Sequence, residues 1–455
     1  MTIQHMIGLT VTLVAIVALS IYSGKAVKKN KEANSWIVAG VIMGTLVGGS
    51  STVGTAQLAY NYGMSAWWWT LGAGIACLIL AVMYVKPLRK SGSSTLLSII
   101  STEYGTKTGF LASVLSSLGS FINIISQLIA ATAIIAVVFP KLSLALSLFI
   151  SAIFMTLYII FGGTKGSGMV GILKMVLLYV AMMACGIMVL CFSGGFSGFL
   201  GIVERIENPE NVPFFSLFAR GIGTDLGACF SLIVGVIATQ SYAQGIFAAK
   251  STKEAKKGAL LSALLVPPVG IGGILVGLYM RSVHPGIVAK TALTMFVTEY
   301  MPPLFSGVVL ATLFIAVLGT GAGLALGIAT VLRNDVIPTL TRKNPGGVTT
   351  ERILIVAILF SACLLSMGPL GDTILNFAFM SMGLRGATIF VPLCCAFWYS
   401  GKVDRRYAFS AIILGPVLVL IFGVWKVLPF DPLFIGIFAS CIISLAGIRK
   451  TPQHT

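Results

Sequence analysis

The sequence has few charged residues. Asp, Glu, Lys and Arg make up 9% of its 455 positions, 57% of the positions are hydrophobic, and the mean hydropathy is +1.00. A soluble domain carries about 25% charged residues, so this composition excludes a soluble enzyme of this length. Apolar runs of about 18 residues or more recur along the chain, each typical of a membrane-spanning helix, and the roughly ten-residue alternating segments of a membrane β-barrel are missing. The sequence therefore predicts an all-α polytopic membrane protein.

Several chemical signatures are missing as well. There is no GxxxxGK[ST] phosphate-binding loop, which argues against ATP-driven transport by this chain. The eight cysteines contain no CxxC pair and lie in or beside apolar runs, so we interpret them as small hydrophobic residues. The three histidines (His5, His284 and His454) fall at span ends or in loops, which argues against an Asp–Glu–His proton relay. No metal or nucleophile–base cluster lies in the apolar runs, so we do not expect an enzyme.

The formal net charge of +17 follows the loops rather than one surface. With thirteen spans, 22 of the 30 Lys and Arg residues lie on one side, six on the other and two within spans. This bias follows the positive-inside rule and predicts a plasma-membrane protein in a lipid bilayer, with an outside N-terminus and a cytoplasmic C-terminus. It does not predict nucleic-acid binding. The predicted spans are 5–23, 36–60, 64–86, 110–139, 142–163, 168–193, 221–248, 258–281, 303–332, 353–369, 374–399, 407–425 and 431–447.

Two predicted spans are interrupted by glycine and hydroxyl residues. The second span holds Gly-Gly-Ser-Ser-Thr-Val-Gly-Thr at 48–55, and the seventh holds Gly, Thr, Gln, Ser and Tyr residues within 235–245. Irregular backbone at membrane depth is tolerated where it lines a cavity or binds something. The two segments are five spans apart and so run in opposite directions, as do paired broken helices in the inverted halves of secondary transporters. Close helix packing by small residues is the alternative explanation.

Few ionisable side chains lie inside the predicted spans: Lys174, Asp225 and Arg385. Arg385 is too far from either span end to reach water easily, and it either binds an anionic substrate or bonds to backbone carbonyls. Asn123 and Gln127 are one turn apart on one helix face and either contact a polar substrate or hold two helices together. Asp225 is expected near the outer end of its span. The Trp67–Trp69 run is expected in the aromatic belt, with a lid over a cavity as the alternative.

Three segments resemble the sodium/solute symporter family over most of the chain. They are GGSSTVGTAQLAY at 48–60, QSYAQGIFAAKSTKEAKKG at 240–258 and AVLGTGAGLALGIATVLRND at 316–335. The resemblance implies a leucine-transporter-like fold with a 5+5 inverted repeat and two discontinuous helices. The implied division is an extra helix in 1–35, a first repeat in 36–193, an extracellular loop with a short surface helix in 194–220, a second repeat in 221–399 and extra helices in 400–455.

The resemblance also implies a sodium site made by carbonyls of Gly44, Val47 and Ala316 and the hydroxyl of Thr320. Thr320 is the second of the two adjacent hydroxyl positions and the first is Gly319, so one ligand is missing, with water or Ser50 as its substitute. Where the family shows Thr-Asp-x-x-Gln, this chain has Val170, Gly171 and Lys174, and the signature arginine is replaced by Gly245. Lys174 either extends toward the cytoplasmic end of its helix, replaces the site cation, or contacts the substrate.

The resulting functional hypothesis is a secondary active transporter that imports a small polar solute by alternating access, with sodium as the coupling ion. Sodium-independent transport with Lys174 as an internal cation, either proton-linked or uncoupled, is the alternative. A channel or a solute sensor is the candidate from another class. Sugars, amino acids, carboxylates and vitamins all suit the predicted pocket. The predicted substrate-binding residues are Ser50, Ser51, Thr52, Thr55, Asn123, Gln127, Thr239, Gln240, Tyr242 and Arg385.

Overall fold

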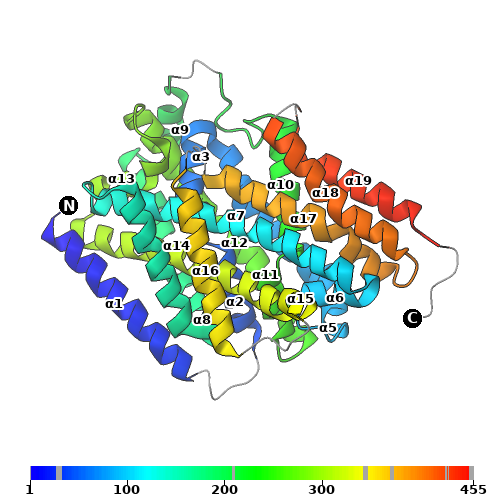
Figure 1. Ribbon diagram of the computed structural model, residues 1–455. Coiled ribbons are helices and arrows are strands. Elements are labelled where there is room, and N and C mark those ends of the chain that lie inside the picture. The colour runs from blue at the N-terminus through cyan, green and yellow to red at the C-terminus, as the bar shows by residue number, and fades with distance from the viewer. Residues whose placement is uncertain are drawn as a thin grey trace.

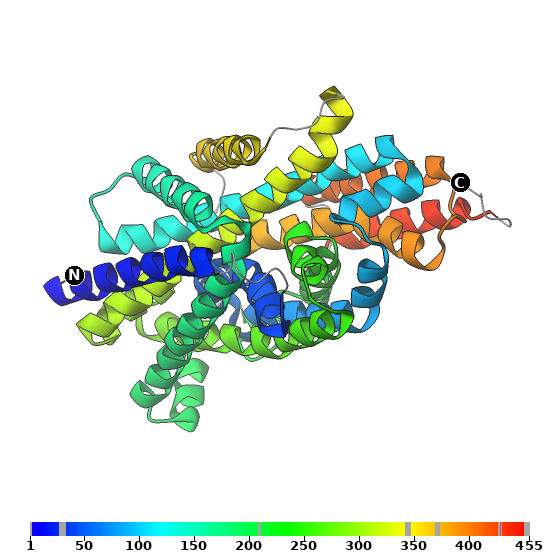
Figure 2. The same cartoon turned by 90° about the horizontal axis from the view of Figure 1, so that it is seen from below.

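The computed structural model is a bundle of helices (Figures 1 and 2) and describes residues 2–26, 33–207, 211–341, 347–368, 374–425, 428 and 430–449. The all-α prediction is confirmed. The first half of the chain contains α1 (Ile3–Ala26), α2 (Ser35–Leu46), α3 (Thr55–Tyr62), α4 (Trp68–Ile79), α5 (Val85–Lys90), α6 (Leu96–Tyr104), α7 (Thr106–Val138), α8 (Leu144–Phe192) and α9 (Phe196–Glu204). The second half contains α10 (Ile222–Ile237), α11 (Gln240–Phe247), α12 (Thr252–Val283), α13 (Ala292–Tyr300), α14 (Pro303–Val331), α15 (Ile337–Thr341), α16 (Val348–Ser366), α17 (Ile374–Trp398), α18 (Arg405–Trp425) and α19 (Leu433–Ala446).

Within the described part of the chain, eight helices are long and apolar enough to cross a membrane, or up to nine when the bent pair α10–α11 counts as one span. Four shorter apolar helices cover 3–16, 35–46, 144–160 and 433–446. The predicted total of thirteen spans and the predicted repeats stay predictions. The short helix expected in the 194–220 loop is present as α9.

One predicted boundary differs from the structure. The sequence predicts two spans at 142–163 and 168–193, separated by a short loop at 164–167 that glycines flank, whereas 144–192 is helical throughout as α8. Glycine lowers helix propensity by only about 1 kcal/mol per residue, which tertiary packing routinely overrides. The two apolar stretches 144–160 and 171–192 still match the two predicted spans in position.

Both predicted helix interruptions are present. The first separates α2 from α3, where Val47 is extended and Ser50–Gly54 form a π-helical segment, η1. The second separates α10 from α11 at an extended Thr239, with a bend of 46°. Both helices that the sequence predicts to be discontinuous are interrupted in the described part of the chain.

The arrangement of the bundle puts α14 in its interior. In the most apolar window of Pro303–Thr341, 89% of the residues are buried, against 28% for α16. The terminal helices lie at opposite ends of the molecule: α1 at one side and α18 and α19 at the other (Figures 1 and 2). Helices α1 and α14 approach closely, since a Cβ on Gly307 would lie 2.2 Å from the carbonyl oxygen of His5. The two helix breaks thus lie among helices drawn from both halves of the chain.

Candidate cation and solute site

The first helix break lies against α14. A Cβ on Gly48 would lie 2.3 Å from Oγ1 of Thr320, and a Cβ on Gly49 would lie 2.5 Å from Cβ of Ala130. Both distances are shorter than real Cβ contacts allow, so only glycine fits at these two positions. The glycines predicted to weaken the second span therefore also let its backbone approach α7 and α14.

A lysine side chain from α8 reaches this break. Nζ of Lys174 donates to the carbonyl oxygen of Gly44 at 2.6 Å and to Oγ1 of Thr320 at 2.8 Å. The Thr320 hydroxyl in turn lies 3.3 Å from the carbonyl oxygen of Val47. Only 3% of Lys174 is exposed. We call Lys174, Gly44, Val47 and Thr320 the lysine centre.

The lysine centre coincides with most of the implied sodium site. Gly44, Val47 and Thr320 come together as the resemblance implies, and Ala316 lies one turn before Thr320 on α14. Oxygen donors of this kind suit a hard cation, but the Lys174 ammonium already bonds to two of them. A sodium ion and the ammonium would therefore compete for the same oxygens. The interpretation that Lys174 extends to the cytoplasmic end of its helix is wrong, because its amine is buried at the helix break.

The predicted substrate hydroxyls of the first break bond to nearby backbone. Oγ of Ser51 donates to Leu46 O at 3.2 Å, and Oγ1 of Thr52 donates to Gly48 O at 2.9 Å. Oγ1 of Thr55 donates to the carbonyl oxygen of Ser50 at 3.0 Å. Hydroxyl side chains commonly satisfy backbone groups in this way. In this conformation the hydroxyl row stabilises the irregular backbone.

Asn123 and Gln127 connect α7 to the first break. Oε1 of Gln127 accepts from the Gly49 N–H at 2.9 Å, and its Nε2 donates to Oγ of Ser50 at 3.0 Å and to Oδ1 of Asn123 at 3.3 Å. Oγ of Ser126 lies 3.3 Å from Oγ of Ser50. Of the two predicted roles, this geometry fits the one in which the amides hold two helices together.

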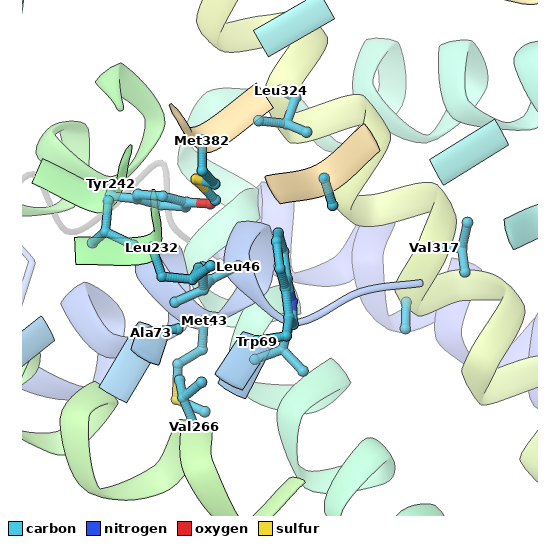
Figure 3. Packing of buried hydrophobic residues seen from close by; sticks show 14 of the residues in the cluster. Met43, Leu46, Trp69, Ala73, Leu232, Tyr242, Val266, Val317, Leu324 and Met382 are labelled. Atoms are coloured by element: carbon cyan, nitrogen blue, oxygen red, sulfur yellow. The ribbon is translucent and has the colours of Figure 1, made fainter. Parts of the chain in front are cut away.

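Trp69 covers the first break instead of lying in an aromatic belt. Its indole Nε1 donates to Oγ of Ser51 at 3.0 Å, and its exposed fraction is 1%. Its ring meets Phe379 edge-on, with centroids 5.2 Å apart. Figure 3 shows Trp69 in the same buried cluster as Leu46 and Tyr242. The aromatic-belt prediction is therefore wrong for Trp69.

The second helix break is bound by Arg385 of α17. Nη1 donates to Oγ1 of Thr239 at 2.7 Å, and Nε donates to the carbonyl oxygen of Ser381 at 3.1 Å. Nη2 donates to Oγ of Ser381 at 2.9 Å and lies 3.1 Å from Sδ of Met382. A Cβ on Gly119 of α7 would lie 2.6 Å from Cγ of Arg385, so glycine at that position makes room for the arginine. We call Arg385, Thr239, Ser381 and Met382 the arginine centre.

The other predicted residues near the second break have different roles. Oε1 of Gln240 accepts from the Leu96 N–H at 2.8 Å and its Nε2 lies 3.4 Å from Ser94 O, so its side chain holds the start of α6. Tyr242 is buried in the cluster that contains Met382 (Figure 3). The structure thus brings Thr239 and Arg385 together and directs the Gln240 amide elsewhere.

An ion pair lies at the predicted outer end of α10. Asp225, fully buried in the first turn as expected, is 2.6 Å from Nη2 of Arg220 and accepts from Oγ of Ser65 at 2.6 Å. The Arg220 guanidinium also lies over the Phe379 ring, 5.4 Å from its centroid. This cluster links the loop before α10 to the segment before α4 and to α17.

Sequence reasoning missed several polar residues. Ser381 and Ser126 complete the two networks, and a narrow cleft beside the second break is lined by further serines. For the serines of α7 the signal was their spacing of one turn, because they continue the helix face that carries Asn123. The cleft is lined by Ser116, Ser117, Ser120, Thr239, Gln240, Ser241, Leu324, Gly327, Ile328 and Val331.

The chain is similar in sequence to known membrane transporters. The model of the sodium:solute symporter family matches residues 29–415. The sodium/pantothenate symporter of Escherichia coli K12 is 21% identical over the whole chain and 99% of its own length. The high affinity choline transporter 1 of Homo sapiens is 21% identical over 88% of this chain and 73% of its own.

Two solved structures share the fold. A Na⁺-coupled sialic acid symporter in a substrate-bound outward-open state superposes with a TM-score of 0.78 at 16% identity, covering 100% of this chain and 99% of its own. A nucleobase-cation-symport-1 family transporter in a closed conformation gives a TM-score of 0.60 at 12% identity, with 92% of each chain covered. Both likenesses concern the arrangement of helices.

Proposed function

The chain belongs to the sodium:solute symporter family, a family of membrane transporters rather than enzymes, and on that premise we propose a specific mode of transport. The protein imports a small polar solute across the plasma membrane by alternating access, with an outside N-terminus and a cytoplasmic C-terminus. The Lys174 ammonium takes the place of the sodium ion at the first helix break. The observation that carries the proposal is the pair of bonds from Lys174 Nζ to Gly44 O and Thr320 Oγ1, at 2.6 and 2.8 Å.

A cation at the first helix break acts on two helices at once. A cation there connects α2 to α14 by bonding to oxygens of both, and so stabilises the conformation in which the two helices are close. A lysine ammonium on α8 makes the same connection with no ion from solution. Because a ligand shifts a conformational equilibrium only by its differential affinity, sodium has little left to stabilise at this centre while the ammonium is present. Loss of one ammonium proton would remove the charge and weaken the connection, because the neutral amine keeps only two N–H donors.

Sodium coupling is the second candidate, and the family supports it. In that case sodium would bind Gly44 O, Val47 O, Ala316 O and the Thr320 hydroxyl after the Lys174 amine has moved away. Solute would bind between the two helix breaks, near the polar residues of the first break, those of α7, those at the start of α11, and Arg385 of α17. Both candidates share the fold and the solute path and differ in which cation occupies the lysine centre.

A comparison of thermal stability in sodium and in N-methyl-D-glucamine, at constant ionic strength, separates the two candidates. Binding raises the unfolding midpoint by mass action. We expect no sodium-specific rise for the wild type and a rise for Lys174→Ala, in which the oxygens are vacated. The exposed Lys253→Ala variant is the matched control and should behave as the wild type. A sodium-specific rise in the wild type that persists unchanged in Lys174→Ala would overturn cation replacement.

A further inference from the structure

The arginine centre contains a buried charge with only neutral partners. The exposed fraction of Arg385 is 0%, and its acceptors are one carbonyl, two hydroxyls and one thioether. These bonds use four of the five guanidinium N–H groups. Among the residues that the structure describes, no Asp or Glu forms an ion pair with Arg385. Arg220, in contrast, pairs with the carboxylate of Asp225.

An isolated buried cation is costly. Removing a charged group from water carries a penalty of several kcal/mol, which neutral acceptors offset only in part. A basic side chain kept inside a membrane bundle without a counter-ion therefore marks a place where an anionic group can bind. The planar guanidinium fork is suited to binding a carboxylate through two parallel hydrogen bonds.

The serine-lined cleft adjoins this charge. Thr239, whose Oγ1 is 2.7 Å from Arg385 Nη1, also lines the cleft. Oγ of Ser241 and Oγ of Ser117, on opposite walls, are buried without a hydrogen-bond partner in the part of the chain that the structure describes. Unpaired buried hydroxyls are uncommon in folded proteins. The cleft thus offers unused hydroxyls next to an uncompensated positive charge.

The cleft is too narrow for a solute in this conformation. Its free volume is about 10 Å³, room for roughly one water molecule. Its walls are α7, the α10–α11 break with α11, and α14, so a solute can enter only when these helices separate. In the predicted topology the cleft lies in the cytoplasmic half of the membrane, where it connects the second break to the inside.

We propose that the transported solute carries a carboxylate and that Arg385, with the hydroxyls of Ser117 and Ser241, binds it during passage toward the cytoplasm. The proposal rests on the transport function proposed above and adds the substrate class. As the cleft opens, the carboxylate replaces Thr239 as a guanidinium partner and takes up the unused hydroxyl donors. Family membership does not decide this, since pantothenate is an anion and choline a cation. The side chains at the second break favour the anion.

The test is a set of matched solute pairs added to the purified full-length protein, with the thermal midpoint as the readout. The pairs are pantothenate with panthenol, N-acetylneuraminate with its methyl ester, and lactate with propane-1,2-diol, and choline is the cationic probe. We expect at least one carboxylate to raise the wild-type midpoint while its neutral counterpart does not. Arg385→Gln should lower the affinity for that carboxylate by tenfold or more. The exposed Arg405→Gln variant should leave this affinity unchanged.

Two further variants keep the test decisive if Arg385→Gln does not fold. Ser241→Ala leaves the charge in place and should lower the affinity for the same carboxylate several-fold. Arg385→Lys should also lower this affinity, because lysine lacks the two parallel N–H donors of the guanidinium. A neutral solute or choline that stabilises wild type and Arg385→Gln equally overturns the proposal, as does a wild type that none of the carboxylates stabilises. Neither outcome affects the proposal that Lys174 replaces sodium, because the response of the lysine centre to sodium is measured without solute.

Discussion

The lysine and arginine centres occupy corresponding places in the two predicted repeats. Lys174 lies on the last helix of the first repeat and bonds to Gly44 of the discontinuous helix that begins that repeat. Arg385 lies on the last helix of the second repeat and bonds to Thr239 of the discontinuous helix that begins it. Each also packs beside the third helix of the other repeat, α14 for the lysine and α7 for the arginine.

The two centres differ in what surrounds the charge. Lys174 bonds to a backbone carbonyl and to a hydroxyl that itself contacts another carbonyl, and so supplies positive charge where the break leaves carbonyl oxygens. Arg385 bonds mainly to side chains and adjoins a cleft with unused hydroxyls. Under the two proposals above, the first of these positions holds an internal cation and the second receives an external anion. Corresponding positions of the two predicted repeats would then divide cation and solute binding between them.

The largest effect is expected at the lysine centre. Lys174→Met removes two hydrogen bonds to a charged group, worth roughly 3 kcal/mol, and each 1.4 kcal/mol is a factor of ten. Uptake of the solute into proteoliposomes should fall by roughly a hundredfold, while Lys253→Met should transport normally. Uptake by Lys174→Met near the wild-type rate would remove the distinction between the two centres.

Two glycine variants perturb the centres one at a time. Gly171 lies one turn before Lys174, and a Cβ on it would lie 2.1 Å from the backbone oxygen of Gly40. A Cβ on Gly119 would lie 2.6 Å from Cγ of Arg385. Such overpacking lowers the stability of a protein by about 1–3 kcal/mol. Gly171→Ala should lower it more than Gly119→Ala, because the backbone of Gly40 cannot move aside as the Arg385 side chain can. We expect Gly171→Ala to change the response to cations and Gly119→Ala to change solute affinity, both measured by thermal unfolding.

The control for the glycine pair is Gly201→Ala in α9, where an added Cβ meets no atom within 4 Å. It should leave stability and both responses unchanged. If Gly119→Ala altered the cation response and Gly171→Ala the solute affinity, the assignment of the two centres would be reversed.

A smaller gain is expected from restoring the missing hydroxyl. A Cβ on Gly319 would lie 3.6 Å from Lys174 Nζ and 3.2 Å from the hydroxyl oxygen of Tyr158, so a serine there points into the lysine centre. In Lys174→Ala/Gly319→Ser, sodium gains an additional oxygen ligand. The sodium-specific rise in midpoint should exceed that of Lys174→Ala alone. An equal rise in both would indicate that sodium binds somewhere else.

The smallest effect is expected at Trp69, which binds the first break without contributing charge. Trp69→Phe loses the indole bond to Oγ of Ser51 and keeps a ring against Phe379. A neutral hydrogen bond is worth about 1 kcal/mol, so thermal unfolding should show a destabilisation of about that size with little change in uptake. A loss as large as that of Lys174→Met would mean that the tryptophan, and not the ammonium, holds this break.

The sequence by itself determined the membrane class, the family and the position of both helix breaks. Apolar runs, glycine–hydroxyl clusters and charge bias are local patterns, and local patterns carry this information without knowledge of contacts. It also identified Lys174 and Arg385 as exceptional, because a basic residue within an apolar run is costly wherever it lies.

Only the tertiary structure decided what those residues contact. Lys174 bonds to partners 130 and 146 positions away, and Arg385 to one 146 positions away, and no periodicity encodes such separations. The same holds for the hydroxyls of the first break, for Trp69 and for the continuity of helix α8. The sequence determined which side chains are costly in a membrane, and the packing of distant helices determined what compensates them.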